Sequence, residues 1–141
     1  MSSVLRSRRF DQLRVLIADD HRLFAESLRV MLCEDERVDV VGIAEAGDEA
    51  VRLATTLLPD VVLMDFSMPG LDGLEATRRI TELGLPCQVL LLTGENGEAN
   101  AVKALEAGAA GFVRKQQGAE ELREVFFQVA SLTSVFGDSR G

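Results

Sequence analysis

The chain has 141 residues, and because a typical domain has about 150 residues, it has room for one domain with a sizeable core. With 47% hydrophobic residues, 27% charged residues and three prolines, the composition excludes disordered, collagen-like and disulfide-stapled proteins. The formal net charge of −8 repels a phosphate backbone, which disfavours direct binding to nucleic acid.

Segment 1–12 carries arginines but no apolar stretch of the kind that signal peptides contain, and we expect it to be a disordered leader. No apolar run reaches the roughly 18 residues that a membrane span requires. Two cysteines, Cys33 and Cys87, are too few for a disulfide scaffold. We therefore expect them to be buried free thiols, and we expect a cytoplasmic location.

Short apolar runs alternate along the chain with longer stretches of helical periodicity. The runs predict strands at Arg14–Ala18, Val38–Ala44, Val61–Met64, Val89–Leu92 and Gly111–Arg114. Between and after them, apolar residues spaced by three and four predict helices with buried faces at Phe24/Leu28/Met31, Ala50/Ala54/Leu57, Gly70–Leu83, Val102/Leu105 and Leu122/Val125/Phe126/Val129. Continuous apolar runs are typical of strands that are buried on both faces, as in a parallel sheet covered by helices.

Five strand-helix units predict a single α/β domain, a three-layer α/β/α doubly wound fold with a five-stranded parallel sheet. We place this domain at residues 13–132. Residues 133–141 are interpreted as a tail or as the start of a linker. Ligands of such folds bind at the carboxyl ends of the strands, so candidate site residues are sought there.

Polar residues follow four of the predicted strands. Asp19 and Asp20 follow the first strand, Asp65 follows the third, Thr93 the fourth and Lys115 the fifth. An aspartate at such a position often caps a helix, but an adjacent pair exceeds what capping requires. Like charges about 4 to 5 Å apart cost about 3 to 4 kcal/mol per pair at an effective dielectric near 20, which favours a bound cation. Carboxylates without a Cys/His ligand set favour Mg²⁺.

These residues lie in motifs that resemble those of response-regulator receiver domains over about residues 13–132. The motifs are LIADDH at 16–21, LMDFSMPGLDG at 63–73, LLTG at 91–94 and AGFVRK at 110–115. The chain is most similar to the receiver portion of the NarL/LuxR class of transcriptional regulators. This resemblance implies a flavodoxin/CheY-like fold with strand order 2-1-3-4-5.

The resemblance also implies residue roles. Asp65 would accept a phosphoryl group from a sensor histidine kinase. Mg²⁺ or Mn²⁺ would be bound by Asp20, Asp65 and the main-chain oxygen of Ser67, with Asp19 acting through water. Lys115 would pair with a phosphoryl oxygen, which suits the compact charge of an ammonium group.

A conformational switch is implied as well. Thr93 would move toward the phosphoryl group, and Phe112 would rotate into the space that this movement opens. Ser67 and Glu95 occupy positions that tune phosphoryl lifetime in this family. Phosphorylation-linked homodimerisation and control of a helix-turn-helix domain outside this chain are the expected outputs. DNA would be contacted through that domain, and no membrane contact is expected.

Two alternatives come from other functional classes. A Mg²⁺-dependent phosphohydrolase also uses a strand-end aspartate, but such enzymes place an Asp-x-Asp motif on the first strand and enclose their substrate with an inserted cap. A pseudo-receiver would only mediate contacts, which the complete acidic set argues against. We therefore expect no enzyme activity beyond the domain's own phosphorylation and dephosphorylation. His21 is interpreted as an exposed residue of the first helical turn rather than as a ligand.

Overall fold

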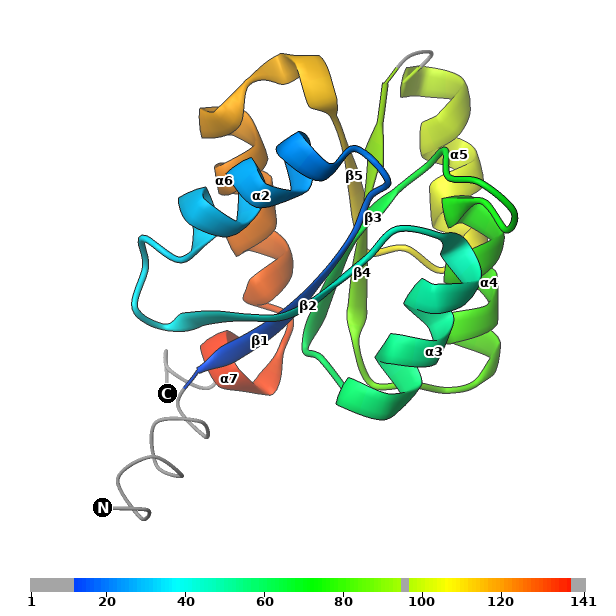
Figure 1. Ribbon diagram of the computed structural model, residues 1–141. Coiled ribbons are helices and arrows are strands. Elements are labelled where there is room, and N and C mark those ends of the chain that lie inside the picture. The colour runs from blue at the N-terminus through cyan, green and yellow to red at the C-terminus, as the bar shows by residue number, and fades with distance from the viewer. Residues whose placement is uncertain (1–11, 95–96, 138–141) are drawn as a thin grey trace.

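The computed structural model describes residues 12–94 and 97–137 of the chain. In this part of the chain, five strands alternate with helices (Figure 1). The strands are β1 Leu13–Ala18, β2 Val38–Ala44, β3 Val61–Asp65, β4 Gln88–Thr93 and β5 Gly111–Arg114. The helices are α2 Arg22–Leu32, α3 Gly47–Leu57, α4 Gly73–Glu82, α5 Gly97–Ala107, the 3-10 helix η1 Lys115–Gln117, α6 Ala119–Ala130 and α7 Ser134–Gly137.

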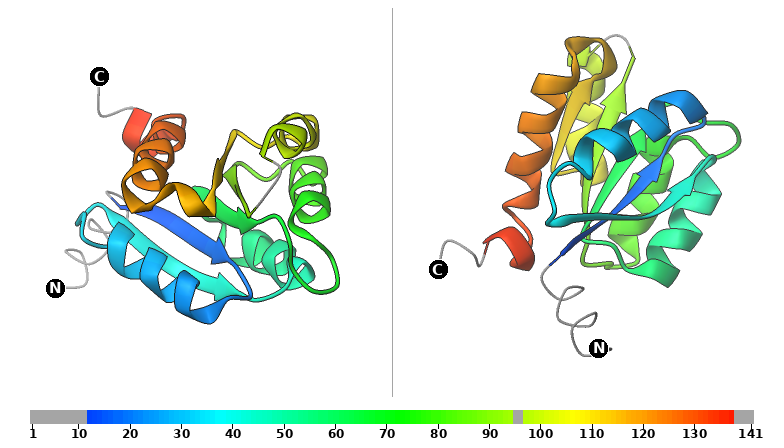
Figure 2. Two further views of the ribbon diagram at one scale, coloured as in Figure 1. Left: turned by 90° about the horizontal axis from the view of Figure 1, so that it is seen from above. Right: turned by 60° about the vertical axis from the view of Figure 1, so that its left-hand side comes forward.

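All neighbouring strands pair in parallel, in the order β2-β1-β3-β4-β5. Helices α2 and α6 cover one face of the sheet, and α3, α4 and α5 cover the other (Figure 2). The predicted three-layer doubly wound fold and its strand order are confirmed. The strand order reverses between β1 and β3, and in folds of this kind the ligand crevice opens where the order reverses.

Alternating side chains of each central strand enter two separate cores. In β1, Val15 and Ile17 pack toward α2 and α6, whereas Leu16 and Ala18 pack toward the other three large helices. All four are fully buried, because a strand covered on both faces places successive side chains on opposite sides. This explains why the strands read in the sequence as continuous apolar runs.

One predicted helix face is wrong. Val102 and Leu105 of α5 are 58% and 65% exposed. The buried face of α5 is formed instead by Ala104 and Ala107, which belong to the core on the side of the sheet that α3, α4 and α5 cover. Spacing alone could not separate these two faces, because the larger residues mark the more hydrophobic stripe even where small residues make the contact.

The boundaries of α4 also differ from the prediction of a helix over Gly70–Leu83. Gly70 has a φ of +70°, so this residue lies in a turn rather than in the helix. The helix begins after Asp72, whose side chain accepts a hydrogen bond from the main-chain N–H of Glu75. A carboxylate cap at this position satisfies an amide that the helix itself leaves unpaired.

Order continues beyond residue 132, where the domain was expected to end. The ring of Phe136, in α7, stacks on Phe127 with centroids 5.8 Å apart, and the guanidinium of Arg37 lies 4.3 Å from the Phe136 centroid. Residues 134–137 therefore pack against the domain. The expected leader, apart from Gln12, and residues 138–141 lie outside the described residues.

The two cysteines are free, but the expectation that both are buried is wrong. Cys33 is exposed at the end of α2, and Cys87 is partly buried before β4. In the described part of the chain, no helix is both long and apolar enough to cross a bilayer.

Candidate functional site

The carboxyl ends of β1, β3, β4 and β5 bring the predicted polar residues to one edge of the sheet. Asp19 follows β1 directly, and its main-chain N–H donates to the carbonyl of Ala44 over 2.9 Å. Asp65 and Thr93 are the last residues of β3 and β4, and Lys115 follows β5. Parallel pairing of these strands therefore places four chain-distant side chains in one location.

The Asp65 carboxylate lies at the centre of this group. The residue is 3% exposed. One oxygen, Oδ2, lies 3.2 Å from Lys115 Nζ, and the other, Oδ1, accepts a hydrogen bond of 3.4 Å from the main-chain N–H of Ser67. Burial, together with repulsion from Asp19, raises the pKa of Asp65 to about 6 even though Lys115 opposes the shift.

Asp19 is fully buried and holds its two oxygens in different environments. Oδ1 accepts a hydrogen bond of 2.8 Å from the main-chain N–H of His21. Oδ2 lies 2.9 Å from Lys115 Nζ, but it accepts no hydrogen bond from any described group. This oxygen is thus held by an ion pair, and a carboxylate oxygen keeps lone pairs that a cation or a water molecule can use.

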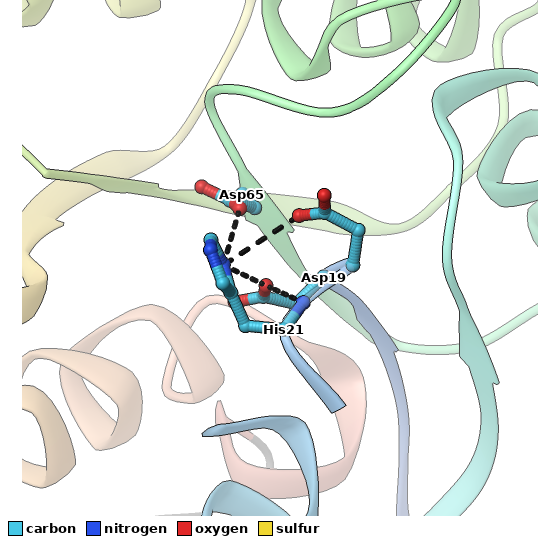
Figure 3. A group of neighbouring side chains, drawn as sticks. Asp19, His21 and Asp65 are labelled. Carbon is cyan, nitrogen blue, oxygen red and sulfur yellow. Dashed lines mark hydrogen bonds and ion pairs between the residues drawn. The ribbon is translucent and has the colours of Figure 1, made fainter. Parts of the chain in front are cut away.

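The side chain of His21 is 68% exposed, as the sequence predicted, but its ring turns back toward the acidic group. Its Nδ1 lies 3.1 Å from Asp19 Oδ1 and 3.8 Å from Asp65 Oδ2 (Figure 3). It also lies 3.5 Å from Asp20 Oδ1. The same atom lies 3.4 Å from Lys115 Nζ. Exposure was predictable from the position of His21 at a helix start, whereas the ring orientation was not.

Thr93 is buried, and its Oγ1 accepts a hydrogen bond of 2.9 Å from Asn100 Nδ2. Sequence reasoning missed Asn100. It lies on α5, and no motif links it to Thr93. A cavity of about 410 Å³ opens over the site, lined among others by His21, Asp65, Ser67, Thr93, Asn100 and Lys115.

Other predicted site residues lie nearby. Ser67 is exposed at the rim of the same cavity. Phe112 on β5 is partly buried against the core that lies on the side of α3, α4 and α5. Glu95 lies outside the described residues.

The donor atoms suit a divalent cation. Asp19, Asp20, His21 and Asp65 each offer one ligand atom, and these atoms lie within 4.8 Å of one another. Carboxylate oxygens are the ligands that Mg²⁺ takes, and the open cavity leaves room for the waters that Mg²⁺ retains. Oδ2 of Asp19, which is ion-paired with Lys115 but accepts no hydrogen bond from the described residues, is a further acceptor for an ion or its bound water. The residues present therefore fit the predicted metal.

The response regulator receiver domain family matches residues 15–127 of the chain. The chain belongs to this family. The receiver domain is therefore a signalling domain, and receiver domains bind Mg²⁺ at an acidic pocket of the kind that Asp19, Asp20 and Asp65 form here.

Curated relatives are similar over most of this receiver domain. Response regulator GacA of Pseudomonas aeruginosa is 39% identical over 117 residues, which are 83% of this chain and 55% of the relative. Response regulator UvrY of Escherichia coli is 37% identical over 128 residues, 91% of this chain and 56% of the relative. The chain thus spans about half the length of the curated relatives that it matches.

Solved structures are similar as well. The receiver domain of the response regulator NarL from Mycobacterium tuberculosis is 37% identical, with a TM-score of 0.80, covering 85% of this chain and 97% of that one. A LuxR-family response regulator from Aurantimonas is 31% identical, with a TM-score of 0.81, covering 92% and 98% of the two chains. The predicted resemblance to NarL/LuxR-type receivers is confirmed.

Proposed function

We propose that this receiver domain is a phosphorylation-dependent switch in which Asp65 accepts a phosphoryl group from a sensor histidine kinase. The observation that carries the proposal is the environment of Asp65. Its carboxylate ends a strand, faces an open cavity and contacts an ammonium group, with a hydroxyl-bearing residue at the end of the next strand. A nucleophile, a charge-neutralising cation and space for a phosphoryl group thus meet at one point.

In the proposed transfer, a carboxylate oxygen of Asp65 forms a bond to phosphorus while the bond between phosphorus and the donor nitrogen of the kinase histidine breaks. The electron pair of that bond leaves with the imidazole, and Asp65 becomes an acyl phosphate. Lys115, 3.2 Å from Asp65 Oδ2, neutralises a phosphoryl oxygen. Ionised Asp65 is the attacking form, and a pKa of about 6 leaves it mostly ionised at neutral pH.

Asp20, Asp65 and the main-chain oxygen of Ser67 would hold Mg²⁺ or Mn²⁺, with Asp19 acting through water. When bound, the ion neutralises the carboxylates and the phosphoryl oxygens that meet here. Asp19 supports this assignment because its Oδ2, which accepts no hydrogen bond from the described residues, is buried beside the other acceptors. The domain would catalyse only its own phosphorylation and dephosphorylation. Ser67 and Glu95 would tune the lifetime of the phosphoryl group.

Thr93 and Phe112 would carry the conformational switch. The hydroxyl of Thr93 would turn toward the phosphoryl group, and its present bond from Asn100 would then change. Phe112 is partly buried on the neighbouring strand and would rotate inward. The phosphoryl group would thereby shift an equilibrium between two states of the domain.

The output would be transcriptional. The Bordetella pertussis relative BvgA, 39% identical over 77% of this chain and 52% of the relative, carries the description of a transcription regulator of virulence factors. By analogy, phosphorylation would promote a homodimer and control a helix-turn-helix domain outside these 141 residues. With a net charge of −8, the receiver domain would leave DNA contact to that domain. Such a regulator would act in the cytoplasm.

The test is phosphorylation by acetyl phosphate and Mg²⁺, followed by intact-mass spectrometry. We expect the wild-type domain to gain one phosphoryl group and Asp65→Asn to gain none, because an amide is not a usable nucleophile. Asp48→Asn, which changes an exposed aspartate on α3, is the matched control and should be phosphorylated normally.

Other outcomes separate the alternatives. Phosphorylation of the Asp65→Asn variant would move the acceptor to another residue. A wild-type domain that takes up no phosphoryl group would favour a pseudo-receiver. Turnover of acetyl phosphate in large excess over the protein, at the rate of an enzyme, would favour the phosphohydrolase.

A further inference from the structure

His21 places an imidazole nitrogen beside the three carboxylates of the acidic pocket. We propose that His21 Nδ1 is an additional metal ligand, so that this pocket binds transition-metal ions with affinity for nitrogen, such as Ni²⁺, through both oxygen and nitrogen. The inference rests on the proposed function in one respect, namely that the pocket holds a divalent cation. The inference adds a ligand to the proposed metal site. A nitrogen ligand provides a selectivity among ions that carboxylates and a main-chain oxygen do not provide.

The distances around Nδ1 fit a shared ion. Carboxylate oxygens of Asp19, Asp20 and Asp65 lie 3.1, 3.5 and 3.8 Å from this nitrogen. With metal–ligand bonds of about 2.1 Å, adjacent ligand atoms lie about 3.0 Å apart in an octahedron and about 3.4 Å apart in a tetrahedron. Lys115 Nζ lies 3.4 Å from the same nitrogen, so the ammonium group would have to turn aside. Small movements of the other side chains would then let one ion contact the nitrogen and the carboxylate oxygens together.

The backbone holds the ring in this position. His21 is the N-cap residue of α2, and its main-chain N–H donates to Asp19 Oδ1 over 2.8 Å. Since this bond ties the histidine to a fully buried carboxylate, the ring starts close to the acidic pocket. The ring also lines the cavity above Asp65.

A second observation points to a bound cation. Asp19 Oδ2 is buried and accepts no hydrogen bond from the described residues, and Lys115 Nζ, 2.9 Å away, is shared with Asp65. One ammonium group thus forms ion pairs with two buried carboxylates. The lone pair of an imidazole nitrogen adds a further ligand, which a cation with affinity for nitrogen would use.

The inference predicts a change in selectivity rather than a general loss of metal binding. Mg²⁺ prefers oxygen ligands and keeps its waters, whereas imidazole binds Mn²⁺ weakly and Ni²⁺ strongly. His21→Ala should lower the affinity for Ni²⁺ by at least about tenfold, since changes even to groups that only support a metal ligand cost about 10- to 100-fold. The affinity for Mg²⁺ should stay within about twofold.

The experiment uses untagged protein, because the chain contains one histidine and an imidazole signal then has one source. Pulsed electron paramagnetic resonance on the Mn²⁺-loaded domain should detect a directly bound imidazole nitrogen in the wild type and lose it in His21→Ala. Displacement of Mn²⁺ by Ni²⁺ or Mg²⁺, followed through the signal of free Mn²⁺, gives the two affinities. Arg22→Ala, which removes the neighbouring exposed side chain that pairs with Glu45, is the control and should resemble the wild type.

The possible failures are distinguishable. Mn²⁺ that binds without an imidazole signal, together with unchanged Ni²⁺ affinity in His21→Ala, would overturn the role of His21 and leave the proposed acidic metal site intact. Absence of Mn²⁺ binding in the wild type would overturn both the metal site and the additional ligand. Equal losses of Ni²⁺ and Mg²⁺ affinity in His21→Ala would also refute nitrogen ligation.

Discussion

Burial makes ionisation of Asp65 unfavourable in the folded domain, so the free energy of unfolding depends on pH. The pKa of Asp65 is raised to about 6 in the folded state by desolvation and by Asp19. An unfolded aspartate has a pKa of about 3.9, so between pH ~4 and ~6 the folded state keeps a proton that the unfolded state has lost. The contribution of Asp65 to the unfolding free energy is therefore fully present below pH ~4 and is lost as pH rises to ~6.

Asp65→Asn should remove this dependence. In EDTA at pH 7.5, we expect the variant to have a higher unfolding free energy than the wild type, by up to about 3 kcal/mol, because one pKa unit corresponds to about 1.4 kcal/mol. At pH 4.5 the difference should be much smaller. Urea denaturation followed by circular dichroism at the two pH values measures it, with Asp48→Asn as the control. A variant that is less stable than the wild type at pH 7.5 would contradict the assigned burial cost.

At the scale of single residues, the sequence identified the strand-end groups but not every contact between them. Asp19, Asp65, Thr93 and Lys115 were predictable because each directly follows or ends an apolar run, and parallel strands bring such ends together. The ring orientation of His21 and the bond from Asn100 to Thr93 depend on side-chain rotation and on the placement of α5. Neither leaves a periodic pattern in the chain.

At the scale of elements, Gly73 fixes the approach of α4 to β3, the strand that ends at Asp65. A Cβ added at Gly73 would lie 1.9 Å from the main-chain oxygen of Asp65, which is a backbone atom that a side-chain rotation cannot move. The main-chain N–H of Gly73 also donates to the carbonyl of Phe66 over 3.0 Å. Helix α4 therefore packs directly on the residues around Asp65, and this contact requires a glycine.

Gly73→Ala should displace α4 or Asp65. We expect a loss of about 1 to 3 kcal/mol of stability, as overpacking of a tight contact typically causes, together with slower phosphorylation by acetyl phosphate. Gly111→Ala is the matched control, because its added Cβ would lie 3.5 Å from Leu90 Cδ1, an ordinary contact. Denaturation and intact-mass kinetics measure the two effects. Equal behaviour of the two variants would show that α4 can shift without cost.

The sequence predicted the elements well where packing follows hydrophobic periodicity and less well elsewhere. The five strands were predicted within one residue at each end, because each is a run of mostly apolar residues, and β1, β3 and β4 are buried on both faces. The exposed stripe Val102/Leu105 on α5 was mistaken for a core face, because small alanines make the actual contact. Helix α7 was missed because a single turn shows no periodicity, and Phe136 acquires its partners Phe127 and Arg37 only in the folded domain.

At the scale of the whole molecule, a divalent cation should raise the thermal stability of the domain. The acidic residues Asp19, Asp20 and Asp65 lie together in the folded state but not in the unfolded chain, so an ion binds the folded state preferentially. At an ion concentration of 100 times the dissociation constant, this adds about 2.7 kcal/mol. We expect a melting temperature several degrees higher in Mg²⁺ than in EDTA, measured by calorimetry.

Asp20→Asn tests whether the acidic group causes this difference. It removes one of the like charges, so the variant should melt at a higher temperature than the wild type in EDTA and should respond less to Mg²⁺. Coincident melting of the wild type in EDTA and in Mg²⁺ would contradict the metal site.

Helix α6 connects the two ends of the domain. It begins after η1, which contains Lys115, and leads to α7, which lies at the end of the sheet opposite the carboxyl end of β3 (Figure 1). Its 12 residues make a rod of about 18 Å at about 1.5 Å per residue. A tilt of about 5° at the Lys115 end of such a rod displaces its far end by about 1.6 Å. In the proposed switch, a small movement at Lys115 would therefore produce a larger displacement at α7.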